Sequence, residues 1–271
     1  MEQIAVTGGK GGTGKSTFAV LLALKLSKKQ RIVLCDADVG CPNDHLILGK
    51  DLKNEKTIEA EFPEIDAEKC TKCGKCVGEC RANALFMVPG KPPRLLKDLC
   101  NNCALCWKIC PEKAIKPVME ECGKSYETLI NENLWLVTGE ATGRPEQAAE
   151  VVKTTKERAM EKAEKGDALL IIDTAAGTHC DVIHALEGTK KAYIVTEPTP
   201  LGEWDSELMV GVLEKLKIRP LFVINRAGVS DDKGIRKLAE RSKAKIEHEI
   251  PYSEEIAKAY SEGKLYNLNI L

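Results

Sequence analysis

The hydrophobic and polar positions of this chain alternate between short apolar runs and longer amphipathic segments. The first part predicts a strand at 4–7, a glycine-rich loop at 8–14, a helix at 15–28 and a second strand at 31–36. The helix has one apolar face, and the second strand has an apolar middle, as is typical of strands covered by helices on both faces of a sheet. This order predicts a parallel βαβ unit at the start of the chain.

The same alternation returns after residue 144. A polar amphipathic helix is expected from Pro145 to Lys165, and the apolar runs after it predict further strands with helices between them. These strands are expected at 168–173, 191–196, 221–225 and 245–250. The pattern predicts an α/β fold with a doubly wound, mostly parallel sheet.

The segment from 66 to 118 interrupts this alternation. It contains eight cysteines and several prolines, and one C-x2-C-x2-C-x3-C run recurs within it at an offset of 30 residues. We therefore expect a discontinuous α/β domain of residues 1–65 and 119–271, with a small α+β domain of residues 66–118 inserted at a surface loop. Weak alternation from Val118 to Thr138 predicts a hairpin that returns the chain to the host domain.

Composition narrows the class of protein. The 271 residues include 40 basic and 41 acidic side chains and are 43% hydrophobic, which argues against intrinsic disorder and against a strongly basic nucleic-acid binder. The apolar run at 18–24 is too short to span a membrane, and no export signal precedes it. We expect a cytoplasmic protein without a membrane span, whose twelve cysteines bind metal or stay reduced.

The loop from Gly9 to Ser16 matches the phosphate-binding pattern G-x4-G-K-[ST] and lies between a predicted strand and a predicted helix. Its glycines let backbone N–H groups converge on phosphate oxygens, and the start of a helix favours anions. Lys15 would reach the β- and γ-phosphates, and the Ser16 hydroxyl would bind Mg²⁺. The nucleotide-binding residues expected here are Gly9, Gly11, Gly12, Thr13, Gly14, Lys15, Ser16 and Thr17.

A second lysine, Lys10, precedes Lys15 in this loop, which therefore resembles the deviant Walker A loop of the MinD/ParA class of P-loop ATPases. The nitrogenase iron protein belongs to the same class. The resemblance implies ATP hydrolysis with Mg²⁺ in an ATP-dependent homodimer, or in a dimer with a paralogous ATPase. Lys10 would then reach the phosphates bound by the partner subunit.

The resemblance extends to the ends of later strands. Asp38 matches the position that orients the attacking water, and Asp173 matches the Walker B position, so that both are implied near Mg²⁺ together with Ser16. An isolated Asp after a strand would be interpreted as a helix cap, but Asp36, Asp38 and Asp173 all follow apolar runs. Further nucleotide contacts are implied at Gly177, Asn225, Arg226 and Pro251.

The two cysteine runs have the spacing of bacterial two-cluster ferredoxins, in which the fourth cysteine of each run binds the other cluster. The first [4Fe–4S] cluster is assigned to Cys70, Cys73, Cys76 and Cys110. The second is assigned to Cys100, Cys103, Cys106 and Cys80. Structural zinc is the alternative, because paired C-x2-C motifs also build four-cysteine zinc sites. Two complete runs favour the ferredoxin interpretation.

The whole chain is thus similar to MinD-superfamily ATPases that carry an inserted ferredoxin domain. We expect ATP-driven dimer closure to control electron transfer to an unidentified redox partner. A carrier or assembly ATPase that delivers clusters to an acceptor protein, and a MinD-like positioning switch with a redox-sensing module, are the alternatives. The insert has ten basic and five acidic residues, which either offset the cluster charge or form a docking face for an acidic partner.

Overall fold

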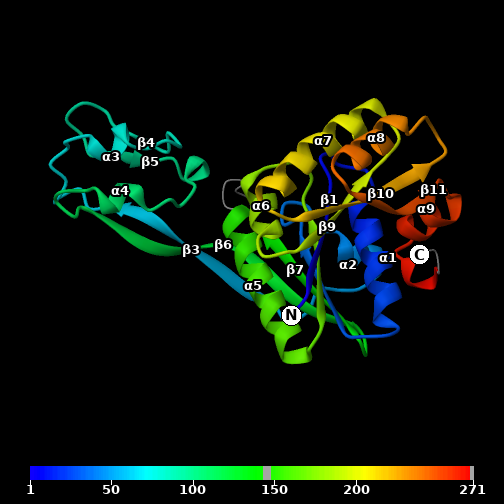
Figure 1. The fold of residues 1–271 in the computed structure, drawn as a ribbon. Helices are drawn as coiled ribbons and strands as arrows, with labels where there is room; N and C mark the ends of the chain where they lie inside the picture. Colours follow the sequence, from blue (N-terminus) through cyan, green and yellow to red (C-terminus); the bar gives the residue numbers. More distant parts are fainter. Residues whose placement is uncertain (143–147, 269–271) are drawn as a thin grey trace.

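The computed structural model describes residues 1–142 and 148–268 (Figure 1). Strands and helices alternate along most of the chain. The strands of the main sheet are β1 (Gln3–Thr7), β2 (Ile32–Ala37), β3 (Lys56–Ile65), β6 (Ile115–Asn131), β7 (Leu134–Ala141), β8 (Leu169–Thr174), β9 (Lys191–Thr196), β10 (Arg219–Ala227) and β11 (Lys245–Pro251). The helices around them are α1 (Lys15–Ser27), α2 (Asp44–Ile47), α5 (Ala148–Gly166), α6 (Cys180–Leu186), α7 (Pro200–Lys215), α8 (Lys233–Arg241) and α9 (Glu254–Ser261).

The main sheet has nine strands in the order β11-β10-β9-β1-β8-β2-β7-β6-β3. The strands from β11 to β7 are parallel, and β6 and β3 extend the sheet by antiparallel pairing. This architecture confirms the predicted α/β fold with a mostly parallel sheet. The start expected for the amphipathic helix, Pro145, lies outside the described residues.

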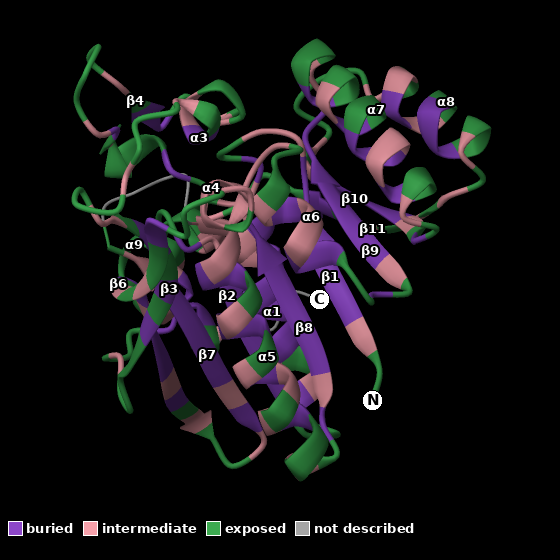
Figure 2. Ribbon diagram, turned by 90° about the vertical axis from the view of Figure 1, so that its left-hand side faces the viewer, coloured by how far each residue is buried: buried purple, intermediate pink, exposed green. Residues whose placement is uncertain are grey.

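Helices cover both faces of the parallel strands, because successive residues of each strand point to opposite sides. On β1, Ile4 and Val6 pack in the core under α1, whereas Ala5 packs in the core under α6 and α7. Figure 2 shows the central strands buried between these layers. None of the helices in the described ranges combines the length and the apolar character that crossing a bilayer requires.

The strands β3 and β6 form a long antiparallel ribbon that carries the cysteine-rich segment away from the body (Figure 1). The ribbon reaches the pair Ile65 and Ile115, and the expected boundary at 118 lies within β6. The segment beyond it, which we call the cysteine module (residues 66–114), contains short elements. They are α3 (Lys75–Gly78), β4 (Leu85–Phe86), β5 (Arg94–Leu95), the 3-10 turn η1 (Lys97–Leu99) and α4 (Leu105–Lys108).

The internal repeat of the cysteine module is also a repeat of backbone conformation. The helical turns α3 and α4 occupy equivalent repeat positions. Left-handed backbone also recurs in equivalent pairs, at Lys72 and Asn102, Gly74 and Ala104, and Asn83 and Lys113. A left-handed residue with a Cβ costs about 1 to 2 kcal/mol, so Ala104 is held there by its surroundings. The two halves therefore share one turn geometry around their cysteines.

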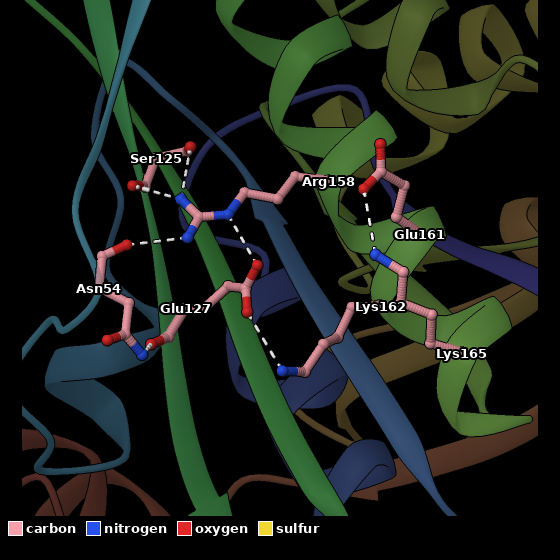
Figure 3. Close-up of polar contacts among 7 residues, drawn as sticks. All are labelled: Asn54, Ser125, Glu127, Arg158, Glu161, Lys162 and Lys165. Atoms are coloured by element: carbon pink, nitrogen blue, oxygen red, sulfur yellow. Dashed lines mark hydrogen bonds and ion pairs between the residues drawn. The ribbon is translucent and has the colours of Figure 1, made fainter.

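A polar network joins the root of the ribbon to α5 (Figure 3). Glu127 on β6 accepts hydrogen bonds from Arg158 Nε at 2.7 Å and from Lys162 Nζ at 3.1 Å. Arg158 also donates to the carbonyl oxygens of Ser125 and Asn54, each at 2.8 Å. Burial alone would raise the pKa of Glu127, but the hydrogen bonds from Arg158 and Lys162 hold it below its ordinary value. Arg158 thus connects the helix layer to β6 and to the segment before β3.

We predict that Arg158→Ala lowers the free energy of unfolding by about 1 to 3 kcal/mol, because it leaves two carbonyl oxygens without their charged donor and Glu127 with only the longer hydrogen bond from Lys162. Lys165→Ala, which removes only an exposed ion pair with Glu161, should cost less than about 0.5 kcal/mol. Urea denaturation measures both. A depressed carboxyl pKa stabilises the fold above the unfolded value of 4.5 and loses that effect as the pH falls, so the Arg158→Ala deficit should shrink in acid. Equal deficits for the two variants would contradict this role of Arg158.

Candidate functional site

The glycine-rich loop joins β1 to α1 and is fixed by a contact from the other half of the sheet. Gly14 has a φ of 94° and directly precedes α1. A Cβ on Gly14 would collide with the side chain of Asn225 at the end of β10. Asn225 Nδ2 donates to the carbonyl oxygen of Thr13 at 2.9 Å. The loop therefore requires glycine at this position, and Asn225 fastens it to the end of β10.

A cavity of about 450 Å³ opens over this loop, within the size range of small-molecule sites. The predicted residues that line it are Gly11, Gly12, Gly14, Lys15, Ser16, Thr17, Asp38, Asn225, Arg226 and Pro251. Tyr252 and Tyr260, which sequence analysis did not single out, line it as well. The cavity thus offers backbone amides and cations for phosphates and aromatic surfaces for a base. Five predicted residues are not part of its lining: Gly9, Lys10, Thr13, Asp173 and Gly177.

Buried charges of both signs surround the loop. Lys15 is 7% exposed, and its Nζ donates to the carbonyl oxygen of Lys10 at 3.0 Å. Burial lowers the pKa of Lys15, while Asp173 and Asp38 act in the opposite direction. Burial raises the pKa of Asp173 to about 7, against the effects of the Ser16 hydroxyl and Lys15. Hydroxyl and carboxylate oxygens are the ligands that Mg²⁺ prefers, so Ser16 and Asp173 fit the predicted cation.

Asp36 organises the loop that follows β2. The register of β2 and β8 pairs Asp36 with Asp173, which puts both residues at the same end of the sheet. Asp36 accepts the backbone N–H groups of Asn43 at 3.0 Å and Asp44 at 3.1 Å. Asp38 lies in this loop and lines the cavity, and its pKa is raised mainly by burial. Asp36 therefore holds the loop that carries Asp38.

Lys10 lies against Glu197 of its own chain. The two side chains form an ion pair, and Glu197 also accepts a hydrogen bond from Arg226 Nη1 at 2.7 Å. Glu197 directly follows β9 and is 8% exposed. Glu197 was not predicted from the sequence, because no local pattern distinguishes it from other acidic residues. Glu197 thus links Lys10 to Arg226, a residue that lines the cavity.

The eight cysteines of the repeat line two cavities in the cysteine module. One is lined by Cys70, Cys73, Cys76 and Cys110. The other is lined by Cys76, Cys80, Cys100, Cys103 and Cys106. The structure thus places Cys110 with the first run and Cys80 with the second. None of these eight cysteines, all within the described residues, forms a disulfide, and the backbone N–H of Ala114 donates to Cys110 Sγ at 3.3 Å.

The distances between these thiols help to distinguish a zinc ion from an iron–sulfur cluster as the group that they would bind. Within the described residues, no three cysteine sulfurs all lie within 4.8 Å of one another. Four sulfurs around a zinc ion, at about 2.3 Å each, would be only about 3.8 Å apart. The apolar neighbours, such as Leu85 and Ile115, and the N–H donor to Cys110 suit thiolates that hold an iron–sulfur cluster.

Comparison with known proteins defines the class of this chain. Residues 4–266 match the family model of the CobQ/CobB/MinD/ParA nucleotide binding domain, and the chain belongs to this family. It is 34% identical to the uncharacterized protein MJ0579 of Methanocaldococcus jannaschii, over 98% of this chain and 91% of that protein. The predicted MinD/ParA class is thereby confirmed.

Two further similarities concern the fold and a short segment. The septum site-determining protein MinD of Pyrococcus horikoshii, solved with Mg-ADP, has the same fold with a TM-score of 0.56. It is 20% identical, and the match covers 97% of this chain and 86% of that one. A stretch of 62 residues is 36% identical to part of the Na(+)-translocating ferredoxin:NAD(+) oxidoreductase complex of Acetobacterium woodii. This match covers 23% of this chain and 15% of the matched component of that complex.

Proposed function

We propose that this protein is an ATP-hydrolysing iron–sulfur protein in which a nucleotide-driven dimer rearrangement controls electron transfer through two [4Fe–4S] clusters. One observation carries the proposal: a single apolar core connects the loop after β2 to the cysteine module. This core contains Val39, Val137 and Ile58, and it continues through Phe62 to Cys100. A nucleotide-dependent movement next to Asp38 would therefore act on side chains that pack against a proposed cluster ligand.

The nucleotide half of the proposal uses the cavity over the glycine-rich loop. Lys15 would hold the β- and γ-phosphates, Ser16 and Asp173 would hold Mg²⁺, and Asp38 would orient the attacking water. Mg²⁺ supplies neutralisation of phosphate charge when it is bound. Asn225, Arg226 and Pro251 would surround the base. Gly177 would act as the hinge of a responsive loop, because its N–H donates to the carbonyl oxygen of Gly8, next to the phosphates, at 3.2 Å.

The iron–sulfur half uses the inserted segment 66–118, with the two thiol sets as ligands. Each [4Fe–4S] cluster supplies one-electron transfer when bound. The thiols would hold the clusters, backbone N–H groups such as that of Ala114 would stabilise the thiolate charge, and the apolar core of the module would keep water away. The similarity of a short stretch to part of a ferredoxin:NAD(+) oxidoreductase complex supports this assignment.

A second subunit, either a copy of this chain or a paralogous ATPase, would complete the nucleotide site through Lys10. Leu201, Trp204 and Leu208 form an apolar strip on α7, and they are 56%, 62% and 48% exposed. Helix α7 lies against the glycine-rich loop, since a Cβ on Gly9 would collide with Asp205. The exposed strip therefore flanks the glycine-rich loop that carries Lys10, where a facing subunit would pack.

A cluster carrier or assembly ATPase is the second candidate, and one observation favours it. Each thiol set contains one exposed member, Cys73 in the first and Cys103 in the second. An acceptor protein could attack a cluster at such a cysteine, whereas the remaining ligands are more buried. The partner of a carrier or assembly ATPase would be a cluster-accepting protein, whereas the partner of the electron-transfer protein would be a redox protein.

We predict that protein purified without oxygen contains about eight iron and eight sulfide per chain, as two [4Fe–4S] clusters require. Cys70→Ser and Cys80→Ser should each damage a different cluster, because these residues line different cavities. Cys41→Ser, outside the module, is the control and should leave the iron content unchanged. Iron analysis and electron paramagnetic resonance of the reduced protein measure the outcome. Stoichiometric zinc without sulfide would refute the iron–sulfur half.

We also predict that Lys10 is needed for ATP-dependent dimerisation. In an Asp38→Ala background, which should bind ATP and hydrolyse it slowly, Lys10→Ala should stay monomeric while it still binds ATP. Glu197→Gln, which removes the charge that holds Lys10, should dimerise at an equal or lower protein concentration. Lys233→Ala, which loses only an exposed ion pair, is the control. Analytical ultracentrifugation with ATP decides the matter: a Lys10→Ala variant that dimerises like its parent would rule out the lysine in trans.

A further inference from the structure

Three fully buried carboxylates converge next to the glycine-rich loop. They belong to Asp36 in β2, Asp44 at the start of α2 and Asp173 in β8, and none is more than 1% exposed. One carboxylate oxygen from each residue lies within 4.8 Å of the other two. Backbone pairing fixes this arrangement, because Asp36 is in register with Asp173 and accepts the N–H of Asp44.

Asp44 has no compensating partner of its own. Both of its carboxylate oxygens are buried, and neither has a hydrogen-bond partner within 1–142 and 148–268. Burial raises its pKa well above the ordinary value, and the charged groups that raise it further are Asp36, Asp173 and Asp38. Lys15 is the cation that lowers the pKa of Asp173, and its ammonium group donates a hydrogen bond to the carbonyl oxygen of Lys10. Buried carboxylates without a donor or cation are costly, so this cluster calls for a positive ligand.

We propose that Asp36, Asp44 and Asp173 bind one divalent cation of the Mg²⁺ or Mn²⁺ class without any nucleotide. The geometry fits such an ion. Two oxygens on opposite sides of a cation, at metal–oxygen distances of about 2.1 to 2.4 Å, lie about 4.2 to 4.8 Å apart. Three carboxylate groups also provide the hard oxygen ligands that these cations prefer, and water would complete the coordination.

This site differs from the Mg²⁺ site of the proposed ATPase in two respects. It uses Asp44, which has no role in the proposed nucleotide chemistry, and it needs no phosphate oxygen. Both sites use Asp173 at the end of β8, and to that extent this proposal rests on the proposed function. A cation bound here in the nucleotide-free protein would fix the loop after β2 against β8, because two of its ligands, Asp36 and Asp44, flank that loop and the third, Asp173, lies in β8.

Manganese binding to the nucleotide-free protein tests the proposal. Electron paramagnetic resonance of free Mn²⁺, followed during titration of the protein, should reveal one Mn²⁺ site per chain, from which Mg²⁺ displaces the ion. Asp44→Asn keeps the shape and removes one ligand charge, so it should weaken Mn²⁺ binding at least tenfold. Asp51→Asn removes an exposed carboxylate just downstream and should bind Mn²⁺ like the parent. The cysteine thiols of the chain should contribute little to the measured Mn²⁺ binding, because hard cations prefer oxygen to sulfur.

Thermal unfolding provides a second measurement that does not depend on the affinity titration. Mn²⁺ should raise the melting temperature of the nucleotide-free parent and of Asp51→Asn, but not that of Asp44→Asn. In EDTA, Asp44→Asn should melt at the same or a higher temperature, because one of three repelling carboxylates is gone. A nucleotide-free parent that binds no Mn²⁺, or Asp44→Asn that binds it like the parent, overturns the proposal. ATP binding in EDTA, measured on the same proteins, reports separately on the nucleotide site.

Discussion

The backbone hydrogen bonds of one continuous sheet are the constraint on which the rest of this structure depends. The strand β1 that leads into the phosphate-binding loop and the strands β3 and β6 that carry the cysteine module belong to the same nine-stranded sheet. Strand β7 connects the two parts: it pairs in parallel with β2 and antiparallel with β6. At the end of β7, Ala141 N–H donates to the carbonyl oxygen of Val39 at 2.8 Å. Neither site could be displaced as a whole without breaking ladder hydrogen bonds.

The distribution of buried charge is the second organising feature. Asp36, Asp44 and Asp173 gather three buried carboxyl groups on one side of the loop, whereas Lys15 lies buried near Asp173 and Asp38 and donates to the carbonyl oxygen of Lys10. Glu197 holds Lys10 and Arg226 at the same time. Each of these groups is costly to bury without its counterpart, and phosphates and divalent cations are the ligands that would satisfy them. The chemistry expected of the family thus agrees with the electrostatics of the single chain.

Sequence alone predicted those parts whose determinants are close together along the chain. The strand, glycine loop and helix at 4–28 form one contiguous motif. The exchange of Cys80 and Cys110 between the two cluster sets stays a prediction, and the cavity linings agree with it. Strand β3 was not predicted, although its apolar residues alternate with charged ones as in a strand with one buried face, and its partner β6 follows only after the whole cysteine module.

Individual site residues were harder to predict where their partners are distant. Glu197 acquires its role only because β9 ends beside the loop that carries Lys10, and nothing near residue 197 indicates this contact. Asp44 resembles an ordinary acidic residue at the start of a helix, where carboxylates are common. Its N–H bond to Asp36, together with the register of β2 and β8, brings it next to two other buried carboxylates. Such roles depend on strand order, which local patterns do not determine.

In the proposed function, nucleotide bound at the P-loop changes what the cysteine module delivers to an acceptor. The most direct test mixes the reduced, cluster-loaded protein with a one-electron acceptor dye, with or without ATP, and follows electrons and iron separately. We expect that ATP changes the rate of dye reduction while iron stays on the protein, and that Lys15→Ala abolishes the ATP effect. Release of iron and sulfide instead would support the carrier function. Identical rates and full retention of iron with and without ATP would contradict the coupling itself.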